Sequence, residues 1–161
     1  MMLTTAQRDA LRLIWQRLHD SDVIWAITGS VGFALHGMEV NPHDIDVQTD
    51  RNGAYRIQEL FGSERTREVR FSETQSIRSH FGELHVADTK VEIMGDLQKR
   101  LPSGEWEPPV DVAIHRRFIQ LDEMSIPVLS LEYEEGAYRL LGRVDRADAI
   151  RRWIMDHPGE T

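Results

Sequence analysis

Apolar residues recur with a helical period near both ends of the chain. The N-terminal stripe, which includes Leu11, Ile14 and Leu18, predicts a helix within residues 1–20. Residues 131–157 carry two further stripes, and the glycine-containing step between them separates two predicted helices. The pattern therefore predicts one helix at the start of the chain and a helical pair at its end.

Between these helices, short apolar runs and alternating segments predict strands. The predicted strands are residues 23–27, 44–48, 69–71, 83–86, 90–94, 110–114, 118–121 and 126–130, and two short helices are predicted at 31–36 and 54–61. Asp88 and Thr89 predict a tight hairpin, and the prolines of residues 98–109 predict a loop. The fold class that follows is α+β, a mixed β-sheet flanked by helices, with a C-terminal helical pair.

The composition is that of an ordinary globular protein. With 161 residues we expect a single domain over 1–161. The net charge of −8, from 19 basic and 27 acidic residues, argues against a general nucleic-acid coat and a polybasic membrane binder. Cysteine is absent, which excludes disulfides, thiol nucleophiles and Cys-ligated zinc. No apolar run is long enough for a membrane span and no signal peptide is visible, so we expect a cytoplasmic protein.

The first candidate for chemistry is a glycine–serine turn between a predicted strand and a predicted helix. Gly29 and Ser30 can present backbone N–H groups and a hydroxyl at the helix start, where the helix dipole favours phosphate. Taken alone, the pattern is more typical of a serine N-cap and a tight turn. Its meaning depends on the residues that follow.

Three acids follow the turn on two predicted strands. Asp44 and Asp46 are two residues apart, so their carboxylates lie on one face of the strand. Neighbouring carboxylates repel unless a cation lies between them, and Mg²⁺ is the usual one. Glu92 interrupts an apolar strand and would join them if the two strands are neighbours. Each acid alone is also typical of a solvated strand face.

The order of these features favours nucleotidyl transfer. Two Mg²⁺ ions bridging the carboxylates and a triphosphate would activate an acceptor hydroxyl and neutralise the leaving pyrophosphate. The third acid would ligate the metal or take the acceptor proton. The sequence contains no Walker A motif, no serine-hydrolase elbow and no histidine pair with zinc-ligand spacing and a suitable partner.

The segment from Trp25 to Gly37, followed by Asp44-Ile-Asp-Val, resembles the signature of the DNA polymerase β-like nucleotidyltransferase superfamily. The resemblance is closest to its small single-domain members, which include the minimal, aminoglycoside and lincosamide nucleotidyltransferases and the AbiEii-like toxins. Here 13 residues, 31–43, separate the Gly-Ser turn from the Asp-x-Asp motif. The minimal members typically have a shorter spacer, so the resemblance points to the other branches.

The resemblance implies Mg²⁺ as cofactor and a nucleoside triphosphate, ATP above all, as co-substrate. It implies that Gly29 and Ser30 hold the β- and γ-phosphates. It also implies that Asp44 and Asp46 ligate both metal ions and that Glu92 completes the second metal site.

The C-terminal helices depart from the family pattern. The family often carries a lysine near the first of these helices, and this chain has none there. Arg139 or Arg143 would then take its place in contacting the triphosphate.

Two hypotheses of different class remain open. The first is a Mg²⁺-dependent nucleotidyltransferase that acts on a hydroxyl of a small molecule or a macromolecule, with nucleic acid entering only as an acceptor such as tRNA. The second is a non-catalytic antitoxin or regulatory binding module that acts with a protein partner, which the small size and the departing tail favour. Retention of Asp44, Asp46 and Glu92 favours catalysis. A cationic acceptor would be sought at loop 98–109 and at the glutamates of 131–135.

Overall fold

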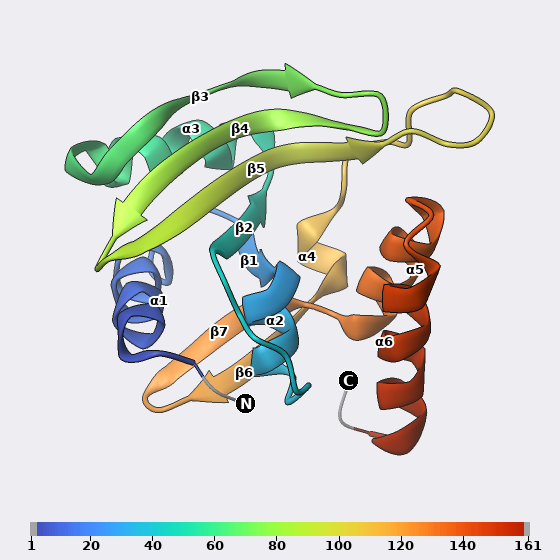
Figure 1. The fold of residues 1–161 in the computed structure, drawn as a ribbon. Coiled ribbons are helices and arrows are strands. Elements are labelled where there is room, and N and C mark those ends of the chain that lie inside the picture. The colour runs from blue at the N-terminus through green and yellow to red at the C-terminus, as the bar shows by residue number, and fades with distance from the viewer. Residues whose placement is uncertain (1–2, 160–161) are drawn as a thin grey trace.

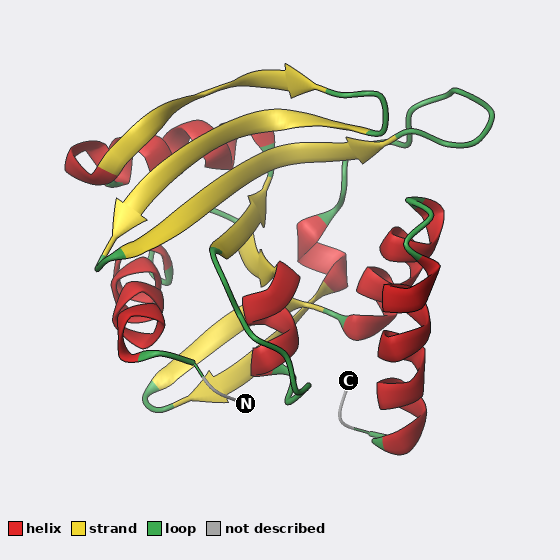
Figure 2. Cartoon of the chain, viewed as in Figure 1, coloured by secondary structure: helices red, strands yellow, loops and turns green. Residues whose placement is uncertain are grey.

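The computed structural model describes residues 3–159, which form one mixed seven-stranded sheet surrounded by helices (Figure 1 and Figure 2). The strands are β1 (Trp25–Thr28), β2 (Ile45–Thr49), β3 (Arg65–Glu73), β4 (Ile77–Val86), β5 (Thr89–Lys99), β6 (Arg116–Leu121) and β7 (Met124–Leu129). The helices are α1 (Thr5–Leu18), α2 (Gly29–Leu35), α3 (Arg51–Leu60), α4 (Val112–His115), α5 (Leu131–Leu140) and α6 (Val144–Asp156), with a 3-10 turn η1 (Gly62–Glu64). Within the described residues, every helix is too short or too polar to span a bilayer.

The sheet has the order β3-β4-β5-β2-β1-β7-β6 and mixes both kinds of pairing. Strand β2 is antiparallel to β1 and parallel to β5, while β1 is parallel to β7. Strands β3, β4 and β5 form a long antiparallel meander that curves across one end of the molecule, and α5 and α6 lie together at its side (Figure 1). The predicted α+β class is therefore confirmed.

Helix α2 lies between two apolar clusters. Its Val31 and Leu35 belong to the main core, which α1 and α3 build with the sheet. On its other side, Phe33 packs with Leu131 of α5 and Ile150 of α6. The short helix that follows β1 is thus held by the sheet on one side and by the C-terminal pair on the other.

Most of the predicted elements are present, with shifted ends. Helix α1 begins after Thr4, whose hydroxyl accepts from the Gln7 N–H in a capping box, and the C-terminal segment divides into two helices as predicted. The strand predicted at 110–114 is wrong, because this segment contains α4. Of the three alternating apolar residues only Val112 is buried, in a cluster with Ala26 and Leu129, while Ile114 is 65% exposed.

Strand β5 and helix α3 approach each other closely at Gly95. A Cβ atom at this position would lie 2.7 Å from the Asp50 carbonyl oxygen and 2.8 Å from the Ala54 Cβ atom. Both are rigid parts of the α3 start, so neither can move aside alone. The absent side chain at Gly95 lets α3 pack directly on the strand that carries Glu92.

We expect Gly95→Ala to lower the free energy of unfolding by about 1–3 kcal/mol, because the methyl group would overpack this contact. Gly136→Ala is the matched control. Gly136 lies inside α5 with open space around it, so alanine there should stabilise by roughly 0.5–1 kcal/mol through helix propensity. Urea unfolding followed by tryptophan fluorescence measures both. Equal effects at the two positions would contradict the close contact.

Candidate active site

The sheet brings the predicted acids together in one row. Asp46 on β2 is the register partner of Glu92 on parallel β5, and Glu92 is in turn the partner of Glu83 on β4. On the other side of Asp46 lies Thr28, the last residue of β1. Asp44 lies two residues before Asp46, at the start of β2. Four carboxylates therefore crowd one face of three adjacent strands.

The Gly-Ser turn lies directly against this row. Gly29 has a φ of +70°, and a Cβ atom there would collide with a carboxylate oxygen of Asp46. A larger residue would be strained by the backbone angle and would displace the carboxylate. The predicted turn and the predicted acids therefore form one compact site.

Ser30 and Gln7 place the segment that leads into Asp44. The Ser30 hydroxyl accepts a hydrogen bond from the His43 N–H at 3.0 Å. The buried Gln7 amide of α1 donates to the carbonyl oxygens of Pro42 and His43 at 2.9 and 3.0 Å. The hydroxyl of Ser30 thus holds the backbone of the residue before Asp44 through this hydrogen bond, a role that the sequence did not reveal.

Crowding changes the acid strength of Asp46. Burial is the largest cause, and the negative charges of Glu92 and Asp44 add to it, so that the pKa of the Asp46 carboxyl is raised from 3.8 to about 7. A cation near this carboxyl would stabilise its ionised form. The site therefore favours the binding of positive charge.

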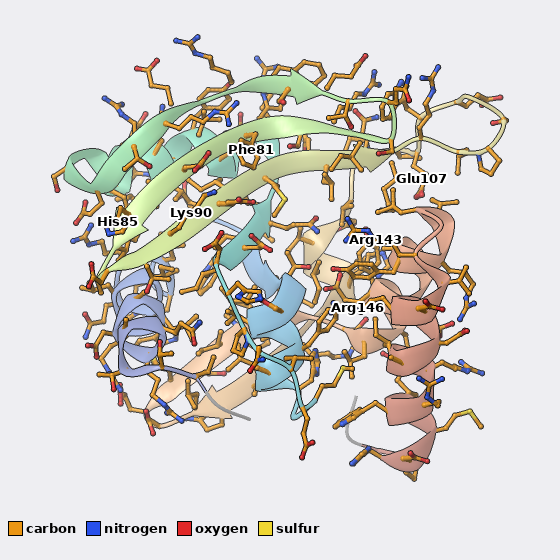
Figure 3. The ribbon with its side chains drawn as sticks, in the orientation of Figure 1. Phe81, His85, Lys90, Glu107, Arg143 and Arg146 are labelled. Atoms are coloured by element: carbon orange, nitrogen blue, oxygen red, sulfur yellow. The ribbon has the colours of Figure 1, made fainter. Side chains whose placement is uncertain are left out.

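Lys90 supplies positive charge to these acids in the structure. Its Nζ lies 3.3 Å from Glu92 Oε1, 3.4 Å from Glu83 Oε1 and 3.9 Å from Asp44 Oδ2. These contacts raise the pKa of the lysine, the hydrogen bond with Glu92 first. Figure 3 shows Lys90 on the exposed face of β5 near His85.

The donor set suits Mg²⁺ in kind, since Asp44, Asp46 and Glu92 offer carboxylate oxygens on one face. The side chains are not yet arranged as a cage. Within residues 3–159, no group of three or more His, Asp or Glu side chains is arranged to hold a metal ion. The ammonium of Lys90 uses oxygens that such an ion would need.

A buried carboxylate holds the turn from behind. Glu134 of α5 accepts from the Thr28 hydroxyl at 2.7 Å and from the Gly29 N–H at 3.3 Å. Burial raises the pKa of Glu134 to about 7, although both hydrogen bonds and the nearby Lys99 oppose the shift. Because Glu134 is buried on the Gly-Ser turn, it is not available to an acceptor, contrary to the expectation for the glutamates of 131–135.

The two predicted phosphate-binding arginines, Arg139 and Arg143, have different surroundings in the structure. Arg139 forms ion pairs of 3.1 Å with Glu135 and with Asp148, so its guanidinium is engaged between α5 and α6. Arg143 instead lies beside the Tyr138 ring, with its Cζ atom 5.8 Å from the ring centroid. The structure thus does not bring Arg139 to the carboxylates.

Arg146, which the sequence did not single out, lies near the turn. Its Cζ atom is 5.4 Å from the Phe33 ring, one helical turn after Gly29, and 5.9 Å from the Tyr138 ring. Burial raises the pKa of the Tyr138 hydroxyl most; the charges of Glu134 and, more weakly, Asp46 add to this, while those of Arg146 and Arg143 oppose it. Tyr138 therefore lies within electrostatic reach of both the arginines and the carboxylates. Figure 3 shows both arginines between the C-terminal helices and the rest of the molecule.

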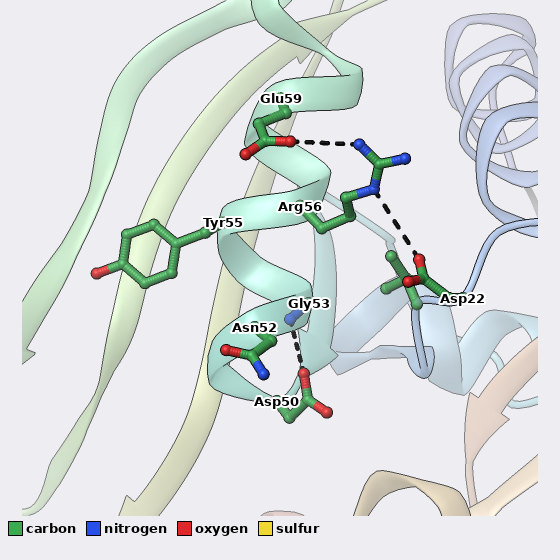
Figure 4. A pocket seen from close by; sticks show the side chains of 8 residues that line it. Asp22, Asp50, Asn52, Gly53, Tyr55, Arg56 and Glu59 are labelled. Carbon is green, nitrogen blue, oxygen red and sulfur yellow. Dashed lines mark hydrogen bonds and ion pairs between the residues drawn. The ribbon is translucent and has the colours of Figure 1, made fainter.

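A cavity of about 400 Å³ lies elsewhere, at the start of α3 (Figure 4). Its charged groups are already paired, since Asp50 caps α3 through the Gly53 N–H and Arg56 lies 3.2 Å from Glu59. No predicted site residue lines this cavity. The acids and the turn remain the candidate site.

Sequence reasoning missed Lys90, Arg146 and the structural role of Glu134. The signal for Lys90 was present, because a residue two positions before Glu92 shares its strand face. No local pattern pointed to Glu134 or Arg146, since their positions depend on how α5 and α6 dock.

Comparisons with known proteins show which family and fold this chain resembles. The model of the aminoglycoside-2''-adenylyltransferase family matches residues 10–151. The solved structure of TM1012 from Thermotoga maritima, a protein assigned as a nucleotidyltransferase, has 49% sequence identity and a TM-score of 0.85 and covers 97% of each chain. The lincosamide antibiotic adenylyltransferase LnuA, solved with lincomycin bound, has the same fold, with 16% identity, a TM-score of 0.53 and coverage of 88% and 96% of the two chains. No curated protein matches the chain significantly.

The raised pKa of Asp46 predicts how its substitution changes stability. The folded state binds the Asp46 proton more tightly than the unfolded chain does, so this group's stabilising contribution is present below about pH 4 and is lost as pH rises through 7. An asparagine at this position carries no charge at any pH. We therefore expect Asp46→Asn to be more stable than the wild type by on the order of 2 kcal/mol at pH 8, with the difference vanishing near pH 4.

Urea unfolding between pH 4 and pH 8 measures this difference. Asp88→Asn is the matched control, because Asp88 lies in the hairpin turn with its side chain 94% exposed, so its substitution removes one charge outside the row of Asp44, Asp46 and Glu92. Parallel pH profiles for wild type and Asp46→Asn would contradict the crowded site.

Proposed function

The chain belongs to the aminoglycoside-2''-adenylyltransferase family and is a nucleotidyltransferase, and we propose that it transfers AMP from ATP to a hydroxyl group of a small-molecule acceptor. The observation that carries the proposal is the row of Asp44, Asp46 and Glu92 against the Gly29 turn. The family supports ATP as the nucleotide and a small polar molecule as the acceptor.

In the proposed reaction the acceptor oxygen attacks the α-phosphorus of ATP. The bond from the α-phosphorus to the oxygen that bridges to the β-phosphate breaks, and pyrophosphate leaves. In this proposal Glu92 takes the hydroxyl proton, which its partly exposed side chain on the row supports. Mg²⁺ held by Asp44, Asp46 and Glu92 would supply Lewis acidity and neutralise phosphate charge when bound.

The triphosphate is proposed to lie between the Gly-Ser turn and α6. The start of α2, at Gly29 and Ser30, faces the acids. Arg146 of α6 lies beside α2, over the ring of Phe33. Arg143 lies close by at the start of α6. Guanidinium groups bind phosphate oxygens through several N–H donors at once, so these two replace the missing family lysine. Arg139 is the less suitable of the predicted pair because Glu135 and Asp148 hold it.

The antitoxin or regulatory alternative is not favoured. The family and TM1012 both point to nucleotidyl transfer, and the three acids lie together as the transfer requires.

The acceptor is proposed to enter over the open face of β4 and β5, where Phe81 and Glu83 lie partly exposed.

Calorimetry of ATP binding with and without Mg²⁺ tests the proposed function. We expect Mg²⁺-linked binding by the wild type and at least about tenfold weaker binding by Asp46→Asn, a loss of about 1.4 kcal/mol. Asp88→Asn should bind like the wild type. If neither the wild type nor Asp46→Asn binds ATP in a Mg²⁺-dependent way, the proposal is wrong. A screen of pyrophosphate release from ATP with aminoglycosides, lincosamides and tRNA then identifies the acceptor class.

Substitution of Arg146 and of Arg139 should affect ATP binding differently. Arg146→Met should weaken ATP binding roughly tenfold or more, because a hydrogen bond to a charged phosphate contributes about 1.5–3 kcal/mol. Arg139→Met should change it little, since its guanidinium is bound within the helical pair. AMP lacks the β- and γ-phosphates and should bind Arg146→Met and the wild type alike. A larger effect at Arg139 would refute this assignment.

A further inference from the structure

Lys90 is one of only two lysines in the chain, and its ammonium lies on the candidate metal ligands. The distances from its Nζ are 3.3 Å to Glu92, 3.4 Å to Glu83 and 3.9 Å to Asp44. The lysine side chain is 44% exposed, so its end can change position without disturbing the core.

The three partners of Lys90 are not equivalent. Glu92 and Asp44 belong to the proposed metal site, while Glu83 lies one strand further from Asp46, on β4. Glu83 also forms an ion pair with Arg67, whose Nη1 lies 3.3 Å from Glu83 Oε2, and this pair keeps Glu83 in place. Glu83 is therefore a second anchor for Lys90, outside the set of Asp44, Asp46 and Glu92.

An ammonium and a divalent ion cannot share these oxygens. Mg²⁺ needs carboxylate oxygens directed at it at short range, and the ammonium of Lys90 already uses one oxygen of Glu92. Two positive charges within a few ångströms also repel strongly at a partly buried site.

We propose that Lys90 is a built-in counter-ion that occupies Glu92 and Asp44 before a divalent ion binds and then moves onto Glu83. The proposal rests on the proposed function, because it takes Asp44, Asp46 and Glu92 as the metal ligands. It makes Lys90 a positioning residue that lowers the affinity for the ion. It makes Glu83 a residue that raises the affinity, because Glu83 receives the displaced ammonium.

Binding of Mn²⁺ without nucleotide, followed by electron paramagnetic resonance, tests both roles. Lys90→Met should bind Mn²⁺ roughly two- to fivefold more tightly than the wild type, the size expected for the loss of partly exposed ion pairs. Glu83→Gln should bind it more weakly, because Lys90 then has only the metal ligands to pair with. In the double variant the Glu83→Gln effect should disappear, since no ammonium needs the second anchor. Lys90→Arg should stay near the wild type.

Arg70→Met is the matched control for net charge. Arg70 lies on β3, 81% exposed, and pairs with Glu68 rather than with the acid row. Its loss should leave Mn²⁺ affinity unchanged, and thermal unfolding checks that every variant is folded.

The outcomes separate this inference from the proposed function. If the wild type binds Mn²⁺ and Asp46→Asn does not, but Lys90→Met binds no more tightly, the counter-ion role is overturned and the metal site stands. An undiminished Glu83→Gln effect in the double variant also overturns it. If neither the wild type nor Lys90→Met binds Mn²⁺, both the metal site and the counter-ion role fail.

Discussion

The close approach of the Asp46 carboxylate to Gly29, which leaves no room for a Cβ atom, is the constraint on which the rest of the site depends. It requires a residue without Cβ at a positive φ, directly after β1, and an acid at the opposite register position of β2. Glu134 completes the arrangement by accepting hydrogen bonds from Thr28 and Gly29 on the far side of the turn. These hydrogen bonds connect helix α5 to the end of the sheet that carries the candidate site.

Charge is the second constraint, because the same register that builds the site also concentrates acids. Asp44, Asp46 and Glu92 lie together, and the buried Asp46 has a pKa near neutrality as a result. Lys90 offsets this charge on the open face. Stability and function oppose each other here, since a neutral residue would relieve the repulsion and remove the proposed ligand.

The C-terminal helices contribute more than packing. They bring Arg143 and Arg146 toward α2, and they hold Arg139 in ion pairs between themselves. Buried Lys99 and the partly buried Tyr133, joined by a 2.7 Å hydrogen bond, anchor α5 to the end of β5. The strand that carries Glu92 and the helix that carries Glu134 therefore hold one another in place.

Local residue patterns determined much of this protein. Alternation along each strand predicted that Asp44 and Asp46 share a face, the glycine–serine turn predicted a strand-to-helix step, and the C-terminal stripes predicted two helices. These features depend on neighbours a few residues apart, so they can be recognised in the chain alone. The resemblance built on them led to the right superfamily.

Only the tertiary structure decided which strands and helices meet. Alternation sets the face of a residue but not its neighbour across the sheet, so the pairing of β5 with β2 and the position of Lys90 between the acids could not be read locally. Likewise, the position of Arg146 beside Phe33, the pairing of Arg139 with Glu135 and Asp148, and the burial of Glu134 follow from how α5 and α6 dock. Residues 112–115 form α4 rather than part of a strand, with Val112 buried against Ala26 and Leu129. Long-range packing decided each of these points, and of them the local pattern gave only the strand face that Lys90 shares with Glu92.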